Sequence, residues 1–272
     1  MKKLLYLTDL AYPAKGRNYG EEDIFIAEHL RSQFDVVLCH PKYAADFEDD
    51  ADLIIFRNTG SILGWKSDYQ AFVQRVHTKK LLTFNTFTGK ADMRGKQYLP
   101  ELTCAGFPVI PTVDALKDRG ALPEAERYFI KPKDGADSIG LRFLTREELA
   151  AQHFADGTML IQPAVDFLYE VSFYFINDRF EYALYAPDPT KRWELVPYPC
   201  SEDDLAFARR FIRWNTIGHG IQRVDACRTQ DGRLLLVELE DLNPYLSILL
   251  TSEATRTAFL QDLTDALWAM TG

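Results

Sequence analysis

The sequence lacks the patterns that mark membrane, secreted and nucleic-acid-binding proteins. No apolar run approaches the roughly 18 residues of a transmembrane helix, and Met1–Lys3 leads into only a short apolar stretch. Positive charge is in deficit, because 31 lysines and arginines stand against 40 acidic residues and the net charge is -9. The average field therefore repels phosphate backbones, and we expect a cytoplasmic protein with neither a nucleic-acid nor a membrane partner.

Cysteine motifs and several nucleotide or catalytic motifs are also missing. The four cysteines are far apart, without C-x-x-C spacing or a histidine pair, so we interpret Cys39, Cys104, Cys200 and Cys227 as reduced structural thiols. No G-x-G-x-x-G follows the first strand pattern, and no G-K-[ST] is present. A Rossmann dinucleotide site and a Walker loop are therefore not expected. The lack of a G-x-S-x-G elbow argues in the same way against a serine nucleophile.

The pattern of apolar and polar residues in 1–89 predicts a Rossmann-like domain. Short apolar and β-branched runs alternate with amphipathic stretches, which is typical of a parallel sheet covered by helices. The expected strands are 3–8, 35–39, 53–57 and 80–84, and the expected helices are 21–33 and 67–76. The first domain is expected to end near Gly89.

After Gly89 the pattern changes to mixed helices and antiparallel strands. Prolines exclude a helix over 107–112, Thr145 opens a capping box, and Asn177-Asp178 is a hairpin signal. The expected helices are 92–105, 145–153, 201–214 and 252–270, and the expected strands are 128–131, 141–144, 159–163, 170–176, 179–184, 222–228 and 233–240. We expect two α+β subdomains, 90–160 and 161–272.

Three acids and an arginine gather on the last predicted hairpin. Strand alternation puts Arg223 and Asp225 on one face of the first strand, and Glu238 and Glu240 on one face of the second. Clustered carboxylates repel one another unless a cation neutralises them, and such oxygen ligands suit Mg²⁺ or Mn²⁺. The residues are equally compatible with a solvated sheet face on which Arg223 pairs with an acid.

A second segment has the composition of an anion site. Lys131 and Lys133 end an apolar strand, and a small polar loop with Asp134 and Ser138 follows. Exposed amides in such a loop can form an anion-binding concavity, so phosphate is the functional interpretation. A surface hairpin with two solvated lysines is the alternative.

A third segment could receive a heterocycle and a sugar. The apolar strand that ends at Gln162 and Pro163 offers backbone groups and one side-chain carbonyl, and Val165 adds an apolar contact. Glu170 follows at a distance from which it could accept sugar hydroxyls. A core strand followed by an edge glutamate is the alternative.

In their order along the chain, these segments resemble the ATP-grasp superfamily. The resemblance spans about residues 95–246: Lys96, then G-F-P-V-I-P-T, a K-P strand with a small loop, Q-P-x-V, and finally R-V-D with E-L-E-x-x-x-P. Within the superfamily it is similar to small stand-alone ligases related to glutathione synthetase and to the cyclo-ligase of cycloserine synthesis. The implied fold is α/β, with a Rossmann-like N-terminal domain followed by two α+β subdomains enclosing the nucleotide.

The resemblance implies ATP and Mg²⁺ (or Mn²⁺) as cofactors, and it assigns roles to residues. Lys96 and Lys131 would contact phosphates, and the loop 134–140 would cover the triphosphate. The remaining assignments are Gln162 and Val165 at the adenine, Glu170 at the ribose, Asp225, Glu238 and Glu240 at the metal, and Arg223 as the catalytic residue beside the γ-phosphate. Asn243 is left open as a further metal ligand.

The implied reaction joins a small-molecule carboxylate to an amine through an acyl phosphate. Substrate is expected at the carboxyl ends of the N-terminal sheet, near Tyr12, Arg17 and Arg57. Arg57 could clamp a carboxylate with two hydrogen bonds, or it could form a structural ion pair. A small-molecule kinase on the same scaffold and a non-catalytic nucleotide-binding subunit are the alternatives. A homodimer is left open.

Overall fold

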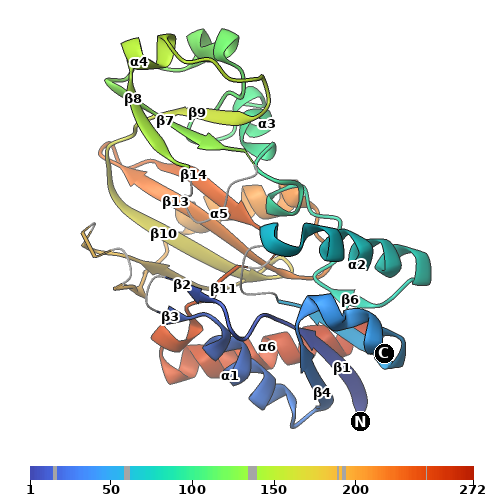
Figure 1. Cartoon of the computed structure of the whole chain (residues 1–272). Coiled ribbons are helices and arrows are strands. Elements are labelled where there is room, and N and C mark those ends of the chain that lie inside the picture. Colours follow the sequence, from blue (N-terminus) through green and yellow to red (C-terminus); the bar gives the residue numbers. More distant parts are fainter. Residues whose placement is uncertain (15–16, 58–61, 134–139, 189, 192–193, 243) are drawn as a thin grey trace.

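The computed structural model describes residues 1–14, 17–57, 62–133, 140–188, 190–191, 194–242 and 244–272 of the chain. Within them, the strands form a parallel sheet near the N-terminus, a large antiparallel sheet and a small antiparallel sheet (Figure 1). This mixture of sheets confirms the predicted α/β class. Over the same residues, no helix has both the length and the apolar character needed to cross a membrane.

The N-terminal sheet is parallel, as predicted. Its order β4-β1-β5-β6 creates a topological switch point between β1 and β5, where open α/β sheets usually bind ligands. Helices α1 and α6 pack on one face and α2 packs on the other. The bounds are β1 (Lys2–Leu7), α1 (Gly20–Leu30), β4 (Phe34–Cys39), β5 (Leu53–Phe56), α2 (Lys66–Lys79) and β6 (Thr83–Phe84). The prediction that the last strand begins at residue 80 is wrong, because Lys80 has a φ of 57° and ends α2.

The large sheet is antiparallel, with the order β12-β11-β10-β13-β14. Its strands are β10 (Phe167–Ile176), β11 (Arg179–Tyr185), β12 (Val196–Pro197), β13 (Ile221–Thr229) and β14 (Leu234–Glu240). One face packs on α5 (Glu202–Asn215) and α3 (Tyr98–Cys104). The Asn177 turn between β10 and β11 has a φ of 55°, in agreement with the predicted hairpin.

The small sheet has the order β8-β7-β9 and stands above the large one (Figure 1). Its elements are β7 (Arg127–Pro132), β8 (Arg142–Thr145), α4 (Arg146–Ala150) and β9 (Met159–Pro163). Thr145 and Glu148 form the predicted capping box at the start of α4. The expected subdomain boundary at residue 160 falls inside β9, which pairs with β7 along its whole length.

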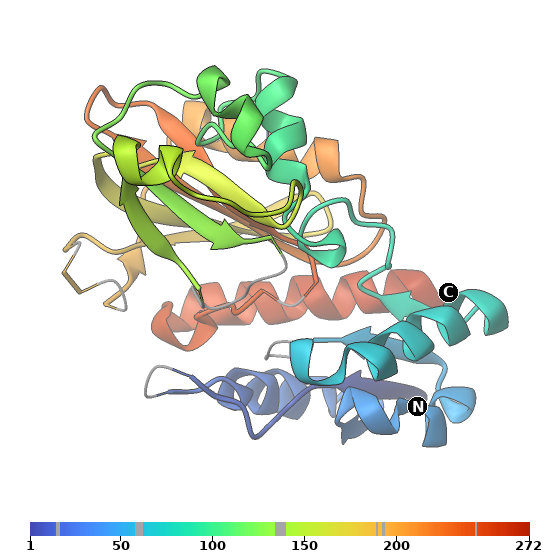
Figure 2. The ribbon, with the colours of Figure 1, turned by 45° about the horizontal axis from the view of Figure 1, so that its top comes forward.

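Helix α6 (Glu253–Thr271) joins the C-terminal end of the chain to the N-terminal sheet. Phe259, Leu263 and Leu267 are buried in one core with residues of β1, α1, β10 and β11. Figure 2 shows the helix running between the N-terminal elements and the large sheet. One face of the N-terminal sheet and one face of the large sheet therefore contribute to the same hydrophobic cluster.

Short elements complete the connections. They are the β2–β3 hairpin (Pro13–Ala14 and Arg17–Asn18) and the 3-10 helices η1 (Pro41–Asp46), η2 (Glu48–Asp50), η3 (Leu63–Trp65), η4 (Asp92–Arg94), η5 (Leu116–Ala121) and η6 (Ile248–Leu250). The predicted helix over 92–105 is wrong in its first half. Gly95, with a φ of 74°, ends η4, and α3 begins only at Tyr98, so Lys96 lies in a turn rather than on a helix.

Candidate active site

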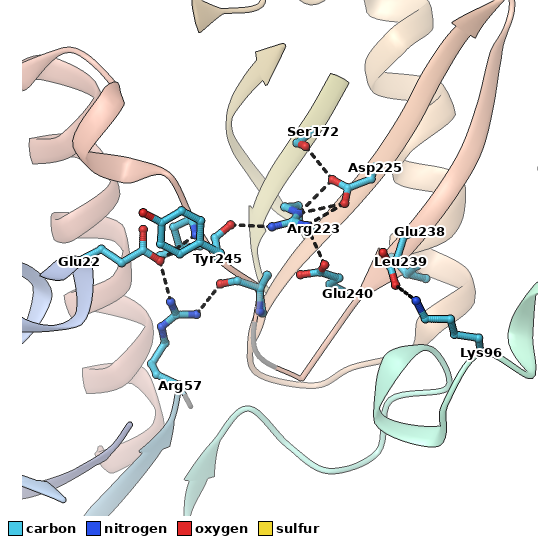
Figure 3. A network of polar contacts seen from close by, with 12 residues as sticks. Glu22, Arg57, Lys96, Ser172, Arg223, Asp225, Glu238, Leu239, Glu240 and Tyr245 are labelled. Atoms are coloured by element: carbon cyan, nitrogen blue, oxygen red, sulfur yellow. Dashed lines mark hydrogen bonds and ion pairs between the residues drawn. The ribbon is translucent and has the colours of Figure 1, made fainter. Parts of the chain in front are cut away.

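The hairpin of β13 and β14 brings the three predicted acids together. In its register Arg223 pairs with Glu240, and Asp225 pairs with Glu238. One carboxylate oxygen from each of Asp225, Glu238 and Glu240 lies within 4.8 Å of the other two. The three acids and Arg223 are all partly buried on the same face of the sheet (Figure 3). The site therefore concentrates negative charge in a region with limited access to water.

Arg223 is the hub of this cluster. Its Nε donates to Asp225 Oδ1 at 2.9 Å, and one terminal nitrogen donates to Asp225 Oδ2 at 2.8 Å and to Glu240 Oε1 at 2.6 Å. The other terminal nitrogen donates to the Tyr245 carbonyl at 2.7 Å. Burial opposes the charge of Arg223, but the two carboxylates outweigh it and hold the pKa of the guanidinium well above its ordinary value. The ion pair left open as an alternative is thus present, within the acid cluster itself.

The third acid, Glu238, is held by Lys96. The Lys96 Nζ lies 2.6 Å from Glu238 Oε1. Burial raises the pKa of Glu238, but the charge of Lys96 outweighs that effect and the pKa is lowered overall. On the same strand the Leu239 amide donates to the Tyr98 hydroxyl at 2.9 Å. Because β14 is an edge strand, this bond from α3 fixes the stretch between the two glutamates.

Lys131, at the end of β7, is the least satisfied cation near the cluster. Among the described residues its ammonium has neither a hydrogen bond nor an ion pair. Burial, together with the nearby charge of Lys96, lowers the pKa of Lys131 to about 8. By contrast, Lys133 Nζ lies 2.6 Å from Asp114 Oδ2. Lys96 and Lys131 are therefore two lysines whose charges act on each other and on Glu238 beside the acid cluster.

Two acids near the site were not predicted from the sequence. Burial raises the pKa of Asp92 to about 7, and the charges of Glu238 and Asp241 raise it in the same direction. Asp241 is fully buried and accepts from the amides of Ala91 at 3.1 Å and Met93 at 2.8 Å. It thereby fixes η4, which carries Asp92 and precedes Lys96. The acidic run E-L-E-D was the available signal for Asp241, whereas no comparable run marks Asp92.

The predicted adenine and ribose residues extend from β9 of the small sheet to β10 of the large sheet. Gln162 is buried in β9, and its side-chain amide donates to Thr112 Oγ1 at 2.8 Å. Val165 is half-buried in the connection from β9 to β10. Glu170 is half-buried on β10 and pairs in register with Cys227. The predicted residues Asp134, Ser138 and Asn243 lie outside the described residues.

The three residues predicted to bind substrate lie in different environments. Arg57 is fully buried, and it binds Asp23, Glu22 and the Pro244 carbonyl, so the structure favours the structural ion pair over a substrate clamp. Tyr12 is half-buried, with its ring centroid 6.2 Å from that of Tyr19. For Arg17 the structure describes only a backbone position in β3.

A pocket of about 380 Å³ lies at the carboxyl ends of β1 and β4. Its polar lining includes Asp9, His40 and Lys42. His40 Nδ1 accepts from the Lys42 amide at 3.1 Å. This edge of the sheet is where the sequence predicts substrate.

The chemistry of the acid cluster fits a divalent cation. Three carboxylates supply only hard oxygen ligands, and their separations allow one ion to reach all three. The nearby ammonium groups of Lys96 and Lys131 suit the oxygens of a phosphate chain. A divalent cation bound with a polyphosphate would satisfy both halves of the site.

Comparison with known proteins gives an independent view of the same features. No family model matches the sequence. The cycloserine biosynthesis protein DcsG of Streptomyces lavendulae is 27% identical over 252 residues, which cover 79% of this chain and 83% of that protein. The crystal structure of D-cycloserine synthetase DcsG superposes with a TM-score of 0.72 at 20% identity, covering 97% of this chain and 99% of that one.

A second solved structure has the same architecture. The ATP-grasp ligase PsnB, complexed with a phosphomimetic variant of its minimal precursor, Mg and ADP, superposes with a TM-score of 0.62 at 15% identity, covering 100% of this chain and 98% of that one. These findings confirm the ATP-grasp fold and the expected resemblance to ATP-grasp ligases. They support ATP-dependent ligation as the general class of reaction.

Proposed function

We propose that this chain, with the fold of the ATP-grasp ligases, joins a small-molecule carboxylate to an amine at the expense of ATP. The carboxylate attacks the γ-phosphorus of ATP, the bond between that phosphorus and the β–γ bridging oxygen breaks, and ADP leaves. The amine then attacks the acyl carbon of the acyl phosphate. Phosphate leaves with the electron pair of the broken bond, and the amine loses a proton. The products are an amide, ADP and phosphate.

The observation that carries the proposal is the juxtaposition of the acid cluster with two lysines. The three acids share one 4.8 Å neighbourhood, and Lys96 reaches Glu238 at 2.6 Å. The charge of Lys96 also lowers the pKa of Lys131, so the two ammonium groups are close enough to repel each other. A polyphosphate anion would relieve that repulsion, and no covalent nucleophile is required.

The lysines and the acids then have separate tasks. Lys96 and Lys131 bind phosphate oxygens, and Lys96 exchanges its contact with Glu238 for a contact with ATP. Asp225, Glu238 and Glu240 would hold Mg²⁺, which when bound supplies positive charge against the phosphate oxygens. Gln162 and Val165 would lie at the adenine edge and Glu170 at the ribose. Lys133 supports the site through Asp114, because that ion pair already occupies its ammonium.

Arg223 stabilises charge during the reaction. Phosphoryl transfer depends mainly on positioning and on electrostatic stabilisation of the transferred group, and acyl transfer develops an oxyanion. The guanidinium of Arg223 is a fixed cation among the acids, held at Asp225, at Glu240 and at the Tyr245 carbonyl. It is thus anchored before substrate arrives, so its orientation costs little during the reaction.

The test is ADP release with Mg²⁺ across a matrix of amino acids, hydroxy acids and amines, followed by mass spectrometry of the products. The proposal predicts ADP release that needs both an acid and an amine, together with an amide of the summed mass less water. ADP release with a stable phosphorylated product would instead identify a kinase. Nucleotide binding without turnover in any combination would identify a non-catalytic subunit.

A further inference from the structure

Buried charged side chains occupy the switch point between β1 and β5 of the N-terminal sheet. Arg57 follows β5 directly, and β5 pairs with β1, so Arg57 stands at the switch point where such sheets usually receive a ligand. Its Nε donates to Asp23 Oδ1 at 3.0 Å, and its terminal nitrogens donate to Glu22 Oε1 at 3.2 Å and to the Pro244 carbonyl at 2.9 Å. The Leu246 amide donates to the same Glu22 oxygen at 2.8 Å.

Burying these charged side chains costs free energy. The side chains of Arg57, Glu22 and Asp23 are each at most 1% exposed. Buried ion pairs seldom stabilise a protein more than apolar residues of similar size would, because the charges must leave water. Apolar residues, however, could not satisfy the carbonyl of Pro244 and the amide of Leu246. The charges therefore serve to bind an irregular stretch of backbone.

The bound stretch, residues 244–246, also contacts the catalytic arginine. The Tyr245 carbonyl accepts from Arg223 at 2.7 Å (Figure 3). The Tyr245 ring stacks on Tyr19 at a centroid distance of 4.1 Å. Arg57 and Glu22 thus hold the residues on either side of the carbonyl that holds Arg223. Asp225 and Glu240, the other partners of Arg223, are proposed metal ligands. The Tyr245 carbonyl is the partner of Arg223 that metal binding would not engage.

We propose that Arg57 and Glu22 are positioning residues that set the orientation of Arg223 through the backbone of residues 244–246. The N-terminal domain then contributes to catalysis without touching the nucleotide. This inference rests on the proposed function, because it gives the two residues a task in that reaction. It predicts that disturbing them slows turnover without weakening the binding of ATP.

Two variants and one control separate positioning from a general structural role. Arg57→Lys keeps the charge but cannot reach three partners as a guanidinium does. Glu22→Gln keeps an oxygen that can accept from the Leu246 amide and removes the charge that Glu22 carries when it is ionised, which it is only in part below pH 8 because burial raises its pKa to about 8. The control is Arg75→Lys, because Arg75 Nε binds the buried Glu48 at 2.7 Å in the same domain and does not contact residues 244–246.

Arg57→Lys is expected to lower kcat roughly 10–100-fold, since small displacements of a catalytic group have effects of that size. The Kd of a non-hydrolysable ATP analogue with Mg²⁺ should stay within about twofold, and Arg75→Lys should change neither quantity. Circular dichroism reports whether each variant folds. If Arg57→Lys does not fold, the same measurements are made on Glu22→Gln, for which we expect a smaller loss of kcat than for Arg57→Lys. A folded variant with unchanged kcat, or with equal losses of kcat and nucleotide affinity, overturns the proposal.

A second readout does not depend on activity. The Nε–H resonance of Arg223, identified as the one missing from Arg223→Lys, should shift in Arg57→Lys and in Glu22→Gln but not in Arg75→Lys. If the wild-type protein releases no ADP with any pair of substrates, the proposed function fails while this measurement still tests the positioning. An Arg223 resonance that stays in place in both variants overturns it.

Discussion

Lys131 should take up a proton when ATP binds. Its pKa is lowered to about 8 by burial and by the charge of Lys96, so in the free protein near pH 8 about half of the molecules carry a neutral lysine. Phosphate oxygens favour the charged form and return the pKa toward its ordinary value. Binding should therefore take up about 0.1 proton at pH 7, about 0.5 at pH 8 and about 0.9 at pH 9.

The coupling between ATP binding and protonation of Lys131 also sets how the affinity for ATP changes with pH. Only the protonated lysine binds phosphate well, so affinity falls as the pH rises through about 8. Between pH 7 and pH 9 the association constant of a non-hydrolysable ATP analogue with Mg²⁺ should fall roughly tenfold. Isothermal titration calorimetry in buffers of different ionisation enthalpy measures both the affinity and the proton uptake.

Lys131→Arg is the matched control, because an arginine stays charged over this range. It should bind the analogue with a nearly constant affinity between pH 7 and pH 9 and without proton uptake. If the wild-type protein shows no uptake at pH 8, the placement of Lys131 against the phosphates is wrong. If Lys131→Arg keeps the wild-type pH dependence, the proton is taken up by a group other than Lys131.

Three further substitutions, one of them with a matched control, test separate parts of the account. Glu238→Gln should reduce ADP release more than about 100-fold, as expected for the loss of charge stabilisation at the reacting group, while circular dichroism stays unchanged. Burial raises the pKa of Glu181 from 4.5 to about 8. Protonation of Glu181 therefore stabilises the folded state fully below pH 4.5, and this contribution to the free energy of unfolding is lost as the pH rises through about 8. Urea unfolding at pH 8.5 should show Glu181→Gln to be more stable than wild type by about 1–3 kcal/mol, an advantage that shrinks at low pH. Gly89→Ala should destabilise the fold by about 1–3 kcal/mol, because its Cβ would lie 2.1 Å from Asp241 Oδ2, whereas Gly64→Ala, with nothing within 4 Å, should have no effect.

The sequence was most informative where periodicity and charge agree. Alternation was enough to predict that Arg223 and Asp225 share one face of the first strand and that Glu238 and Glu240 share one face of the second. The register in the structure then brings the three acids together. The parallel and antiparallel sheets follow from strand patterns of the same kind. These features depend on local geometry, which short-range patterns describe.

Long-range packing could not be predicted in this way. The sequence left Arg57 open as a substrate clamp or a structural ion pair, because nothing in its neighbourhood reveals that α1 supplies two buried carboxylates and that Pro244 supplies a carbonyl. The helix expected over 92–105 failed at Gly95, since a glycine inside an amphipathic pattern does not show whether it adopts a positive φ. The packing of α6 on the N-terminal sheet is likewise a property of the whole chain.

The central claim is that a carboxylate is activated by transfer of the γ-phosphoryl group, and the transfer of isotope from that carboxylate tests it most directly. An acid that supports ADP release is labelled with ¹⁸O in both carboxylate oxygens and turned over with unlabelled ATP and amine. Mass spectrometry of the released phosphate should show one ¹⁸O atom per molecule, because the acyl phosphate leaves one carboxylate oxygen on phosphorus. Released phosphate that is free of label while the amide forms would contradict the account.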